Sequence, residues 1–453
     1  MEPVMILNSN VYAGHFPEKE SFSDVREMVM AVQEAFSAYA LLPLSKRSEI
    51  ISAMKEKLRP LIPGLAELEF KEMQMGNMAD KIIKILLALE RTPGVEDLVT
   101  EASTGDNGMT LYEYSAYGVV CTILPGTNPC ATLISNTIGM LAAGNAIIHI
   151  PNPRCEETTR YLAKQIDRIV AEVCGISNLV IAIPHSSMQQ AEEIMNHPDI
   201  SLVVATGGAR MLHTALSCSK RVIGAGQANP VVIVDETADL KKAARDIVEG
   251  ASFDNNIMCV SEKNLVVVSS VADELIREMK SLGTHYIRNE EDMLRLTKVI
   301  VTSELTMNRA MEGRSAAEIL DNAGISHSPE VRLIVVDTMI THPLFTEEFL
   351  MPVVSMLRVD DFEEGLRSAI FIEQGNRHTA MIHSRSINNL NRAAHELQTS
   401  IFIKNGSSLD AIGFHGGQTS SFTIANITGE GVTTARNFAR RRRCSLTTGF
   451  SIR

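Results

Sequence analysis

The chain has no tryptophan, few aromatic residues and no excess of positive charge. Aromatic residues make up 5% of its 453 residues, which excludes nothing alone, because 45% hydrophobic and 21% charged residues are ordinary for a globular protein. A formal net charge of −12 excludes a general affinity for nucleic acids or anionic membranes. A chain of this length buries a large core, and we expect two or three domains.

Cysteine is also sparse. The seven cysteines form no Cys-x-x-Cys pair, so we expect no metal site; they stand at positions 121, 130, 155, 174, 218, 259 and 444. An odd, scattered set is typical of a reducing cytosol. The first residues have neither the basic start nor the apolar stretch of a signal peptide. These features predict a cytoplasmic protein.

Charged residues are absent from residues 114–153, a stretch long enough for a membrane span. Pro125, Pro129 and Gly144 interrupt it, however, together with several asparagines. The stretch therefore predicts a strand, a helix and a second strand inside the protein, with both strands covered on two faces.

Short apolar strands alternate with amphipathic helices after a front third that is helical over 24–62 and 65–91. The predicted strands form two series, one at 119–124, 146–150, 179–183 and 202–205, and one at 231–235, 265–268, 329–336 and 352–359. This alternation predicts parallel, doubly wound sheets. We expect two α/β domains in tandem, joined near residues 224–230.

Cys259 is the strongest candidate for catalysis. It ends the segment G-A-S-F-D-N-N-I-M-C at 250–259, where small and amide residues after a predicted helix suit a turn that presents a side chain. A nucleophilic cysteine must be partly exposed, with its thiolate stabilised. A buried structural cysteine is the commoner case, and no histidine nearby in the sequence identifies a base.

Two turns between a predicted strand and a helix are candidate ligand sites. In A-T-G-G-A-R at 205–210, glycines let an anion approach a helix N-terminus, although a plain tight turn has the same pattern. In P-G-T-N-P at 125–129, Thr127 or Asn128 is placed to donate to an oxyanion or only to cap the helix. Glu348, considered alone, is an exposed glutamate before a strand. The arginine run at 440–443 is a solvated or subunit-contact segment, or else a contact for phosphate or carboxylate.

In this order and spacing, the segments resemble the aldehyde dehydrogenase superfamily, and specifically its CoA-acylating branch. The most specific pieces are G-A-S-F-D-N-N-x-x-C ending at Cys259, A-T-G-G at 205–208 and G-E-G-x-T-T-A-R-x-F-x-R-R-R-R-C at 429–444. The resemblance implies an aldehyde dehydrogenase fold of two tandem doubly wound α/β domains with a small β oligomerisation arm. The implied parts are a dinucleotide-binding domain for NAD and CoA (1–108 and 119–228), a catalytic domain (229–438) and the arm (109–118 and 439–453).

The resemblance also implies residue roles. Cys259 matches the nucleophile, and the turn formed by Thr206, Gly207 and Gly208 matches the one that faces the cofactor. Glu348 matches the glutamate of the E-x-F-G-P element that holds the nicotinamide ribose.

Two of these matches are imperfect. The central F-G of the E-x-F-G-P element is Leu350-Met351 here. The P-W-N-F-P element matches 125–129 with its asparagine shifted by one place, which leaves the oxyanion donor open between Thr127 and Asn128.

Two departures separate this chain from hydrolytic members. Their E-L-G-G-K-x-P is G-A-G-Q-A-N-P at 224–230, so Gly224 stands where a glutamate would activate water, and Gly226 is expected beside the cofactor. An acyl-enzyme without that base should wait for a thiol. Their V-K-P, whose lysine contacts the adenosine ribose, is H-I-P at 149–151, so Ile150 and Pro151 are expected at a pocket used in turn by NAD and CoA.

The resemblance therefore implies oxidation of a short aldehyde, propionaldehyde or acetaldehyde, with NAD and CoA through a thiohemiacetal and a thioester of Cys259. It implies a homodimer or tetramer inside a bacterial microcompartment, in contact with its shell or co-encapsulated enzymes, although residues 1–16 show no convincing encapsulation helix. Two alternatives stay open: a hydrolytic aldehyde dehydrogenase with another base, and a non-catalytic packing protein. The aldehyde's chain length and the choice between NAD and NADP stay open as well.

Overall fold

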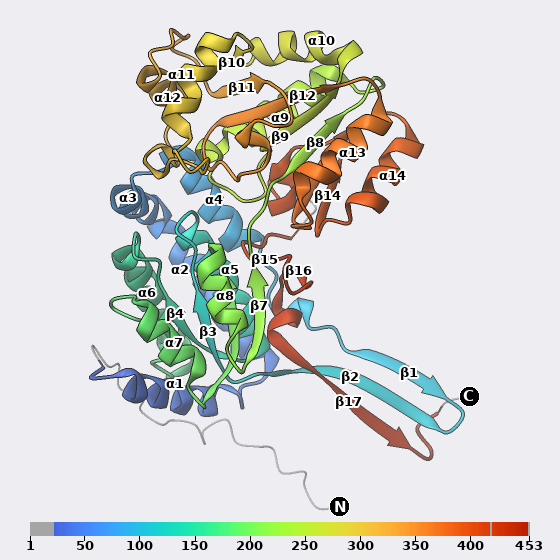
Figure 1. Ribbon diagram of the computed structural model, residues 1–453. Coiled ribbons are helices and arrows are strands. Elements are labelled where there is room, and N and C mark those ends of the chain that lie inside the picture. Colours follow the sequence, from blue (N-terminus) through green and yellow to red (C-terminus); the bar gives the residue numbers. More distant parts are fainter. Residues whose placement is uncertain (1–21, 417–418, 452–453) are drawn as a thin grey trace, which may run out of the picture.

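Two parallel β-sheets form two lobes, and a three-stranded antiparallel arm projects from the lower lobe (Figure 1). The structure is a computed structural model that describes residues 22–416 and 419–451. Residues 1–16, in which the sequence shows no convincing encapsulation helix, lie outside these ranges. Within them, no helix is both long and apolar enough to cross a membrane.

The first sheet contains five parallel strands in the order β5-β4-β3-β6-β7. These are β3 (Val119–Ile123), β4 (Ala146–Ile150), β5 (Val180–Ala182), β6 (Ile200–Thr206) and β7 (Arg221–Ala225). Every residue of β3 and β4 is buried, as the charge-free stretch predicted.

Helices cover both faces of this sheet, as right-handed crossovers require. One face carries α5 (Pro129–Ala143) and α6 (Glu156–Cys174), and the other carries α1 (Val25–Tyr39), α7 (Met188–Asn196) and α8 (Ala209–Leu216). The remaining front helices, α2 (Leu44–Leu58), α3 (Ile62–Met73) and α4 (Met78–Arg91), pack around α5 and α6. The wholly buried α5 is therefore enclosed between the sheet and a second helical layer.

The second sheet contains seven parallel strands in the order β10-β11-β12-β9-β8-β13-β14. These are β8 (Val231–Val234), β9 (Asn264–Val268), β10 (Thr284–Ile287), β11 (Leu333–Asp337), β12 (Val353–Val359), β13 (Thr379–His383) and β14 (Ile401–Lys404). Val232 packs on one face with α9 (Leu240–Ser252) and α10 (Ser269–Lys280), whereas Val231 packs on the other with α13 (Phe362–Glu373) and α14 (Ile387–Leu397). This alternation is the two-residue period of a strand.

Two further helices, α11 (Glu290–Ile300) and α12 (Ala316–Asn322), pack with strands at the β10 edge of the second sheet. The sequence-based assignment missed both, together with β7, β10, β13 and β14. These strands have only four or five residues with polar ends, which leaves little apolar periodicity to detect. The strand expected at 329–336 begins only at Leu333, because Pro329 and Glu330 lie in an exposed turn.

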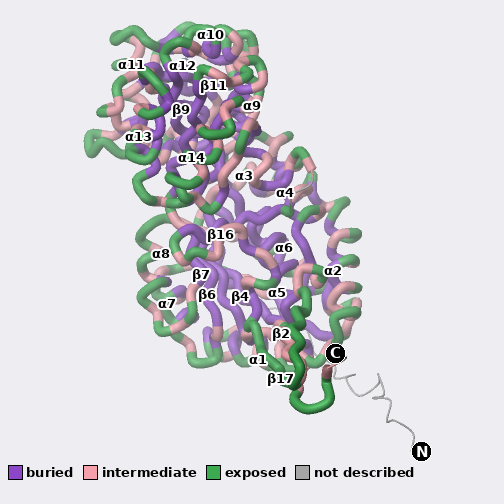
Figure 2. Tube along the Cα trace, turned by 90° about the vertical axis from the view of Figure 1, so that its right-hand side faces the viewer, coloured by how far each residue is buried: buried purple, intermediate pink, exposed green. Residues whose placement is uncertain are grey.

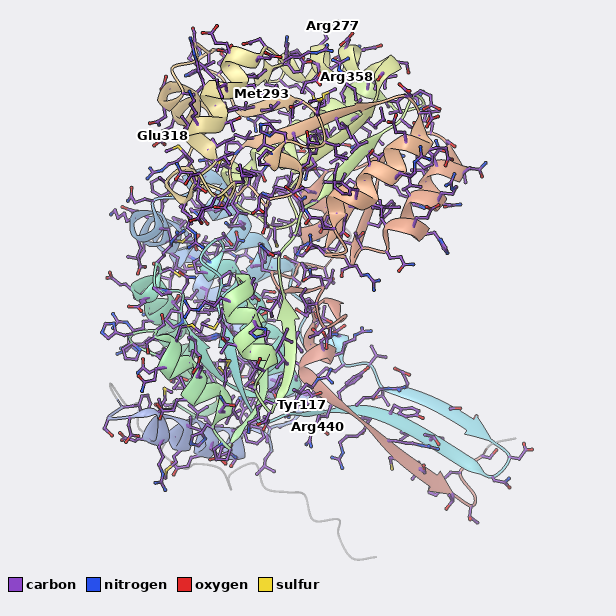
Figure 3. The ribbon with its side chains drawn as sticks, viewed as in Figure 1. Tyr117, Arg277, Met293, Glu318, Arg358 and Arg440 are labelled. Atoms are coloured by element: carbon purple, nitrogen blue, oxygen red, sulfur yellow. The ribbon has the colours of Figure 1, made fainter. Side chains whose placement is uncertain are left out.

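The arm consists of β1 (Glu101–Gly105), β2 (Gly108–Ala116) and β17 (Ala439–Thr447) in the order β1-β2-β17. Within the segment 439–453, β17 begins at Ala439, whose register partner is Ala116, and residues 452–453 lie outside the described part. The labelled Tyr117 and Arg440 mark the place where the arm leaves the lobe (Figure 3).

The arm is mostly exposed, unlike the lobes that it leaves (Figure 2). Its arginines are held from within the arm: Arg440 Nε donates to the Ala116 carbonyl at 3.0 Å, and Arg441 donates to Glu101 at 2.7 Å. The run at 440–443 is thus part of a strand that is exposed within one chain, and its interpretation as a solvated or subunit-contact segment stays a prediction.

After β14 the chain returns to the first lobe. A small antiparallel ladder pairs β15 (Ile424–Ala425) with β16 (Gly431–Val432), and Phe422, Ala435 and Phe438 join the apolar core of the first lobe. The domain boundaries at 108, 228 and 438 remain a proposal. Residues 422–438 pack against the first lobe, although the proposed boundaries assign them to the catalytic domain.

Candidate functional site

The carboxyl ends of four neighbouring strands gather most of the predicted binding residues. The Leu124 N–H, after β3, donates to the carbonyl of Ile150 at the end of β4 at 3.0 Å, and the Gly207 N–H, after β6, donates to the Ala225 carbonyl of β7 at 3.3 Å. The strand order reverses between β3 and β6. Open parallel sheets bind ligands at this kind of switch point.

The start of α8 forms an open cradle at this edge. A Cβ atom added at Gly207 or Gly208 would meet no atom within 4 Å, and Gly208 precedes the first turn of the helix without a side-chain cap. A helix N-terminus with space in front of it favours a phosphate group. The cradle therefore fits the pyrophosphate of a dinucleotide.

The other predicted cofactor residues of this edge are more enclosed. Ile150 and Pro151 are buried. The Thr206 hydroxyl lies 3.0 Å from the Thr423 hydroxyl, so it is engaged inside the protein. The Gly226 N–H donates to the Asn426 side chain at 2.9 Å. Any contact of these residues with a ligand therefore runs through the backbone or through apolar surface.

The space beside Gly224 is not empty. A Cβ atom there would meet Leu212 Cδ1 at 2.9 Å and Thr428 Cγ2 at 3.5 Å, so neighbouring side chains occupy the space of a glutamate. The absent base is thus replaced by packing. The side chain of a Gly224→Glu variant would first have to displace Leu212.

Cys259 follows a strained turn. Asp254, Asn255 and Asn256 have consecutive φ values of 46°, 51° and 59°, in the left-handed region. Asp and Asn tolerate this region best among residues other than glycine, at about 1–2 kcal/mol each. Strain of this kind collects at functional sites where the surroundings hold it, and it explains why this segment reads D-N-N.

Hydrogen bonds from several elements hold the turn. The Asn255 side chain donates to the carbonyls of Gly76 and Gly313 at 3.1 and 2.9 Å, and the Asn256 side chain donates to the Glu262 carbonyl at 3.0 Å. Asp254 Oδ1 accepts from the Asn77 N–H at 2.7 Å. The turn that presents the half-buried Cys259 is therefore rigidly fixed between the two lobes.

Glu348 and Lys263 flank the Cys259 thiol electrostatically. Glu348, which the sequence alone would leave exposed, is half-buried, and the nearby backbone of Ala228 opposes the rise of its pKa. Lys263 is buried, and its Nζ donates to the Asn256 carbonyl at 2.6 Å. The E-x-F-G-P glutamate, the 224–230 segment and the cysteine thus meet.

These groups shift one another's acidity. Burial raises the pKa of the Cys259 thiol to about 12 and Glu348 adds to the rise, whereas Lys263 and the backbone N–H groups of Cys259 and Val260 oppose it. Burial likewise raises the pKa of Glu348 to about 7 and lowers the pKa of Lys263 to about 8. The thiol is therefore protonated at neutral pH in the protein alone, and its reactivity depends on the charge of its two neighbours.

Asn128 does not cap α5, although the P-G-T-N-P pattern allowed that reading. No side-chain capping bond is present at this position. Instead Asn128 Oδ1 accepts from Lys84 Nζ at 2.6 Å, and Asn128 Nδ2 donates to the Thr127 hydroxyl at 3.1 Å. Lys84 also contacts Asp254, and this ion pair joins the P-G-T-N-P turn to the turn before Cys259.

Sequence reasoning missed Lys263, Lys84 and Asp254 as members of the site. A signal existed for Lys84, because Lys81, Lys84, Ile85 and Ala88 fall on one helical stripe, and the structure buries all four. Lysines on an apolar stripe call for buried partners. No comparable pattern marks Lys263, whose burial depends on the packing of both lobes.

Comparisons with known proteins agree with the geometry. The aldehyde dehydrogenase family model matches residues 9–434. The propanal dehydrogenase (CoA-propanoylating) of Salmonella typhimurium is 45% identical over 437 residues, which make up 96% of this chain and 94% of that protein.

Two solved structures are similar over nearly their whole length. The Rhodopseudomonas palustris propionaldehyde dehydrogenase, solved with bound CoA and an acylated cysteine, has 39% identity and a TM-score of 0.92 and covers 94% of this chain and 98% of its own. A propionaldehyde dehydrogenase from the Clostridium phytofermentans fucose utilisation bacterial microcompartment has 38% identity and a TM-score of 0.92, with 95% and 99% covered.

Proposed function

The chain belongs to the aldehyde dehydrogenase family and to its CoA-acylating branch, and we propose that Cys259 carries the acyl group between its two substrates. The reaction is the oxidation of a short aldehyde, propionaldehyde or acetaldehyde, with NAD and CoA to acyl-CoA and NADH. The assignment of Cys259 rests on one observation: a strained, tightly held turn presents this cysteine between Glu348 and Lys263. The similar Rhodopseudomonas enzyme, with its acylated cysteine and bound CoA, supports it.

In the proposed mechanism the Cys259 thiol gives up its proton to solvent, and the thiolate attacks the aldehyde carbon to form the alkoxide of a thiohemiacetal. The former aldehyde oxygen, on which negative charge develops, accepts hydrogen bonds from the Asn128 side chain and the Cys259 backbone N–H. NAD supplies the hydride acceptor that turns this adduct into a thioester of Cys259. Because Gly224 provides no carboxylate to activate water, the thioester persists until the CoA thiol attacks its carbonyl and Cys259 leaves as the thiolate.

We assign the dinucleotide to the carboxyl edge of the first sheet. Gly207 and Gly208 offer backbone N–H groups and open space to a pyrophosphate. Thr206, Gly226, Ile150 and Pro151 form the surrounding wall. Glu348, which lies near the backbone of Ala228, takes the nicotinamide ribose.

The test is NADH formation from propionaldehyde and NAD, with and without CoA, with the product identified and NADP compared as acceptor. We expect sustained turnover and propionyl-CoA only with CoA, and a single stoichiometric burst of NADH without it. Cys259→Ala should abolish both signals, whereas Cys218→Ala, a change at another half-buried cysteine, should preserve them. Steady NADH with free propionate and no need for CoA would instead support the hydrolytic alternative.

We further propose that the protein is a homodimer or tetramer of a bacterial microcompartment. The arm of β1, β2 and β17 is largely exposed within one chain. Because three strands without a core of their own need a partner surface, we expect the arm to form the contact between subunits. The similarity to the Clostridium microcompartment enzyme supports the location. Contact with shell proteins or co-encapsulated enzymes belongs to the same proposal.

A further inference from the structure

Four charged side chains are buried together beneath the site. Glu69, Lys81, Lys84 and Asp254 are all fully buried, and their two negative and two positive charges balance. Lys81 Nζ lies 3.2 Å from Glu69 Oε1 and 3.5 Å from Asp254 Oδ2, and Lys84 Nζ contacts Asp254 Oδ2. Buried ion pairs are poor sources of stability, because desolvation offsets their attraction. A cluster of this kind therefore calls for a role besides stability.

The two lysines differ in their second partner. Both reach Asp254, but Lys81 also donates to Glu69 Oε1, whereas only Lys84 donates to Asn128 Oδ1, at 2.6 Å. Burial lowers the pKa of Lys84, and its contact with Asp254 opposes the loss of its proton. A lysine ammonium has three donors and no acceptor. The Asn128 amide must therefore turn its oxygen to Lys84 and its NH₂ group the other way.

This orientation sets which group the Asn128 amide offers to a ligand. The Thr127 hydroxyl oxygen already accepts a hydrogen bond from Asn128 Nδ2 at 3.1 Å. An amide NH₂ group has two N–H donors, so Asn128 retains a second one for a ligand oxygen. Without Lys84, either end of the amide could face that oxygen, and the carbonyl end would repel it.

Lys84 is itself held by the turn before the nucleophile. Its partner Asp254 stands in the left-handed turn, where its N–H donates to Asp80 Oδ2 at 2.9 Å and its Oδ1 accepts from the Asn77 N–H at 2.7 Å. Both of these contacts come from the region where α4 begins. The position of Lys84 is thereby linked to the backbone that presents Cys259.

We propose that Lys84 is a positioning residue for the reaction: held by Asp254, it fixes the Asn128 amide with its NH₂ group toward the substrate oxygen. This inference rests on the proposed function and deepens it. Lys84 touches neither substrate nor cofactor and acts only through Asn128.

The experiment measures the rate of the NADH burst without CoA, per burst-competent site, in the full-length protein. Lys84→Met should slow the burst about 10- to 100-fold, somewhat less than the loss of an oxyanion donor itself. Lys81→Met is the matched control, because Lys81 lies in the same buried cluster and also contacts Asp254 but does not contact Asn128. It should stay within about threefold of the wild-type rate even if it lowers stability. Equal slowing by both variants would overturn the proposal.

A double-mutant cycle with Asn128→Ala provides the decisive readout. If Lys84 acts through Asn128, the Lys84→Met/Asn128→Ala protein reacts no more slowly than Asn128→Ala alone. Multiplicative slowing would mean that Lys84 acts by another route and would refute the inference. Lys84→Gln, which keeps a donor for Asn128 Oδ1, should recover much of the rate lost in Lys84→Met.

Should Lys84→Met fail to fold, the cycle is run in a Glu69→Gln background, where removal of Lys84 leaves Lys81 and Asp254 as a balanced pair and the Lys84–Asp254 contact of the reference protein is kept. The absence of additional slowing in the double mutant again supports the role of Lys84, and multiplicative slowing again refutes it. Failure of the proposed function would appear differently, as the absence of any NADH burst in the wild-type protein. A normal wild-type burst with a multiplicative cycle would refute only the role of Lys84.

Discussion

The Cys259 thiol lies between two ionisable groups that pull its pKa in opposite directions. Glu348 raises it and Lys263 lowers it, on top of a larger increase from burial. Burial raises the pKa of Glu348 to about 7. In the protein without ligands, the thiol should therefore be least reactive above this pH, where Glu348 is ionised. Ligand binding that neutralises or moves Glu348 would then raise the thiolate fraction.

Replacement of Glu348 by Gln should speed the alkylation of Cys259. In the absence of ligands near pH 7.5, we expect iodoacetamide to label Glu348→Gln about tenfold faster than wild type, since removal of a nearby like charge lowers a pKa by about one unit. Below about pH 6 Glu348 is protonated in the wild type, so the two rates should converge. Lys263→Met should change the rate at pH 7.5 in the opposite direction. Mass spectrometry of the Cys259 peptide measures the labelling rate. Identical rates in all three proteins would contradict this account.

At the scale of elements, two glycines at the same sheet edge have different reasons to be glycine. Gly207 faces open space in front of α8, whereas Gly224 in β7 is packed against Leu212 and Thr428. The first position is kept small for a ligand and the second for the protein's own packing. The sequence alone made both look like features of the active site.

Alanine at these two positions should separate binding from stability. Gly207→Ala should leave the free energy of unfolding within about 0.5 kcal/mol of wild type but raise the KM for NAD, because its methyl group projects into the cradle. Gly224→Ala should lower the free energy of unfolding by about 1–3 kcal/mol, the usual cost of overpacking. Urea unfolding and initial rates check both expectations. An unaltered KM in Gly207→Ala would argue against the assignment of the dinucleotide to this edge.

The left-handed turn before Cys259 provides an element-scale stability test. Asn255→Ala loses two hydrogen bonds and gains backbone strain, so we expect a loss of about 2–4 kcal/mol in the free energy of unfolding. Asn255→Gly loses the same bonds without the strain and should cost about 1–2 kcal/mol less. If the two variants are equally stable in urea unfolding, strain in this turn is not significant.

At the scale of the molecule, the arm has little buried surface within one chain. Register pairs β17 with β2 along nine residues, from Ala439–Ala116 to Thr447–Gly108, yet nearly every residue of β17 is exposed. Removal of β17 would leave β2 with an unpaired edge, which is a template for aggregation.

Truncation after Phe438 should therefore abolish the proposed oligomer and favour aggregation, as measured by sedimentation velocity. Truncation after Thr448 keeps β17 complete and serves as the control, which should sediment like the wild-type protein. A wild-type protein that sediments as a monomer would refute the proposed association.

The sequence alone determined the α/β class, the order of most strands and helices, and the position of Cys259 at the end of a helix-to-loop segment. The aldehyde dehydrogenase fold, which the resemblance of the motifs implied, was confirmed; the alternation of apolar strands and helices by itself predicted parallel, doubly wound sheets. The resemblance also selected Thr206–Gly208 and Glu348 as candidates. These are local signals, which survive without knowledge of the packing.

Only the tertiary structure decided which side chains face one another. The contact of Lys84 with both Asp254 and Asn128 joins three segments that are far apart in the sequence, and the packing that fills the space at Gly224 comes from α8 and the loop at 427–428. The acidity of Cys259 depends on burial and on charges brought near by folding. Dielectric environment and long-range contacts are properties of the folded chain, and no spacing along the sequence encodes them directly.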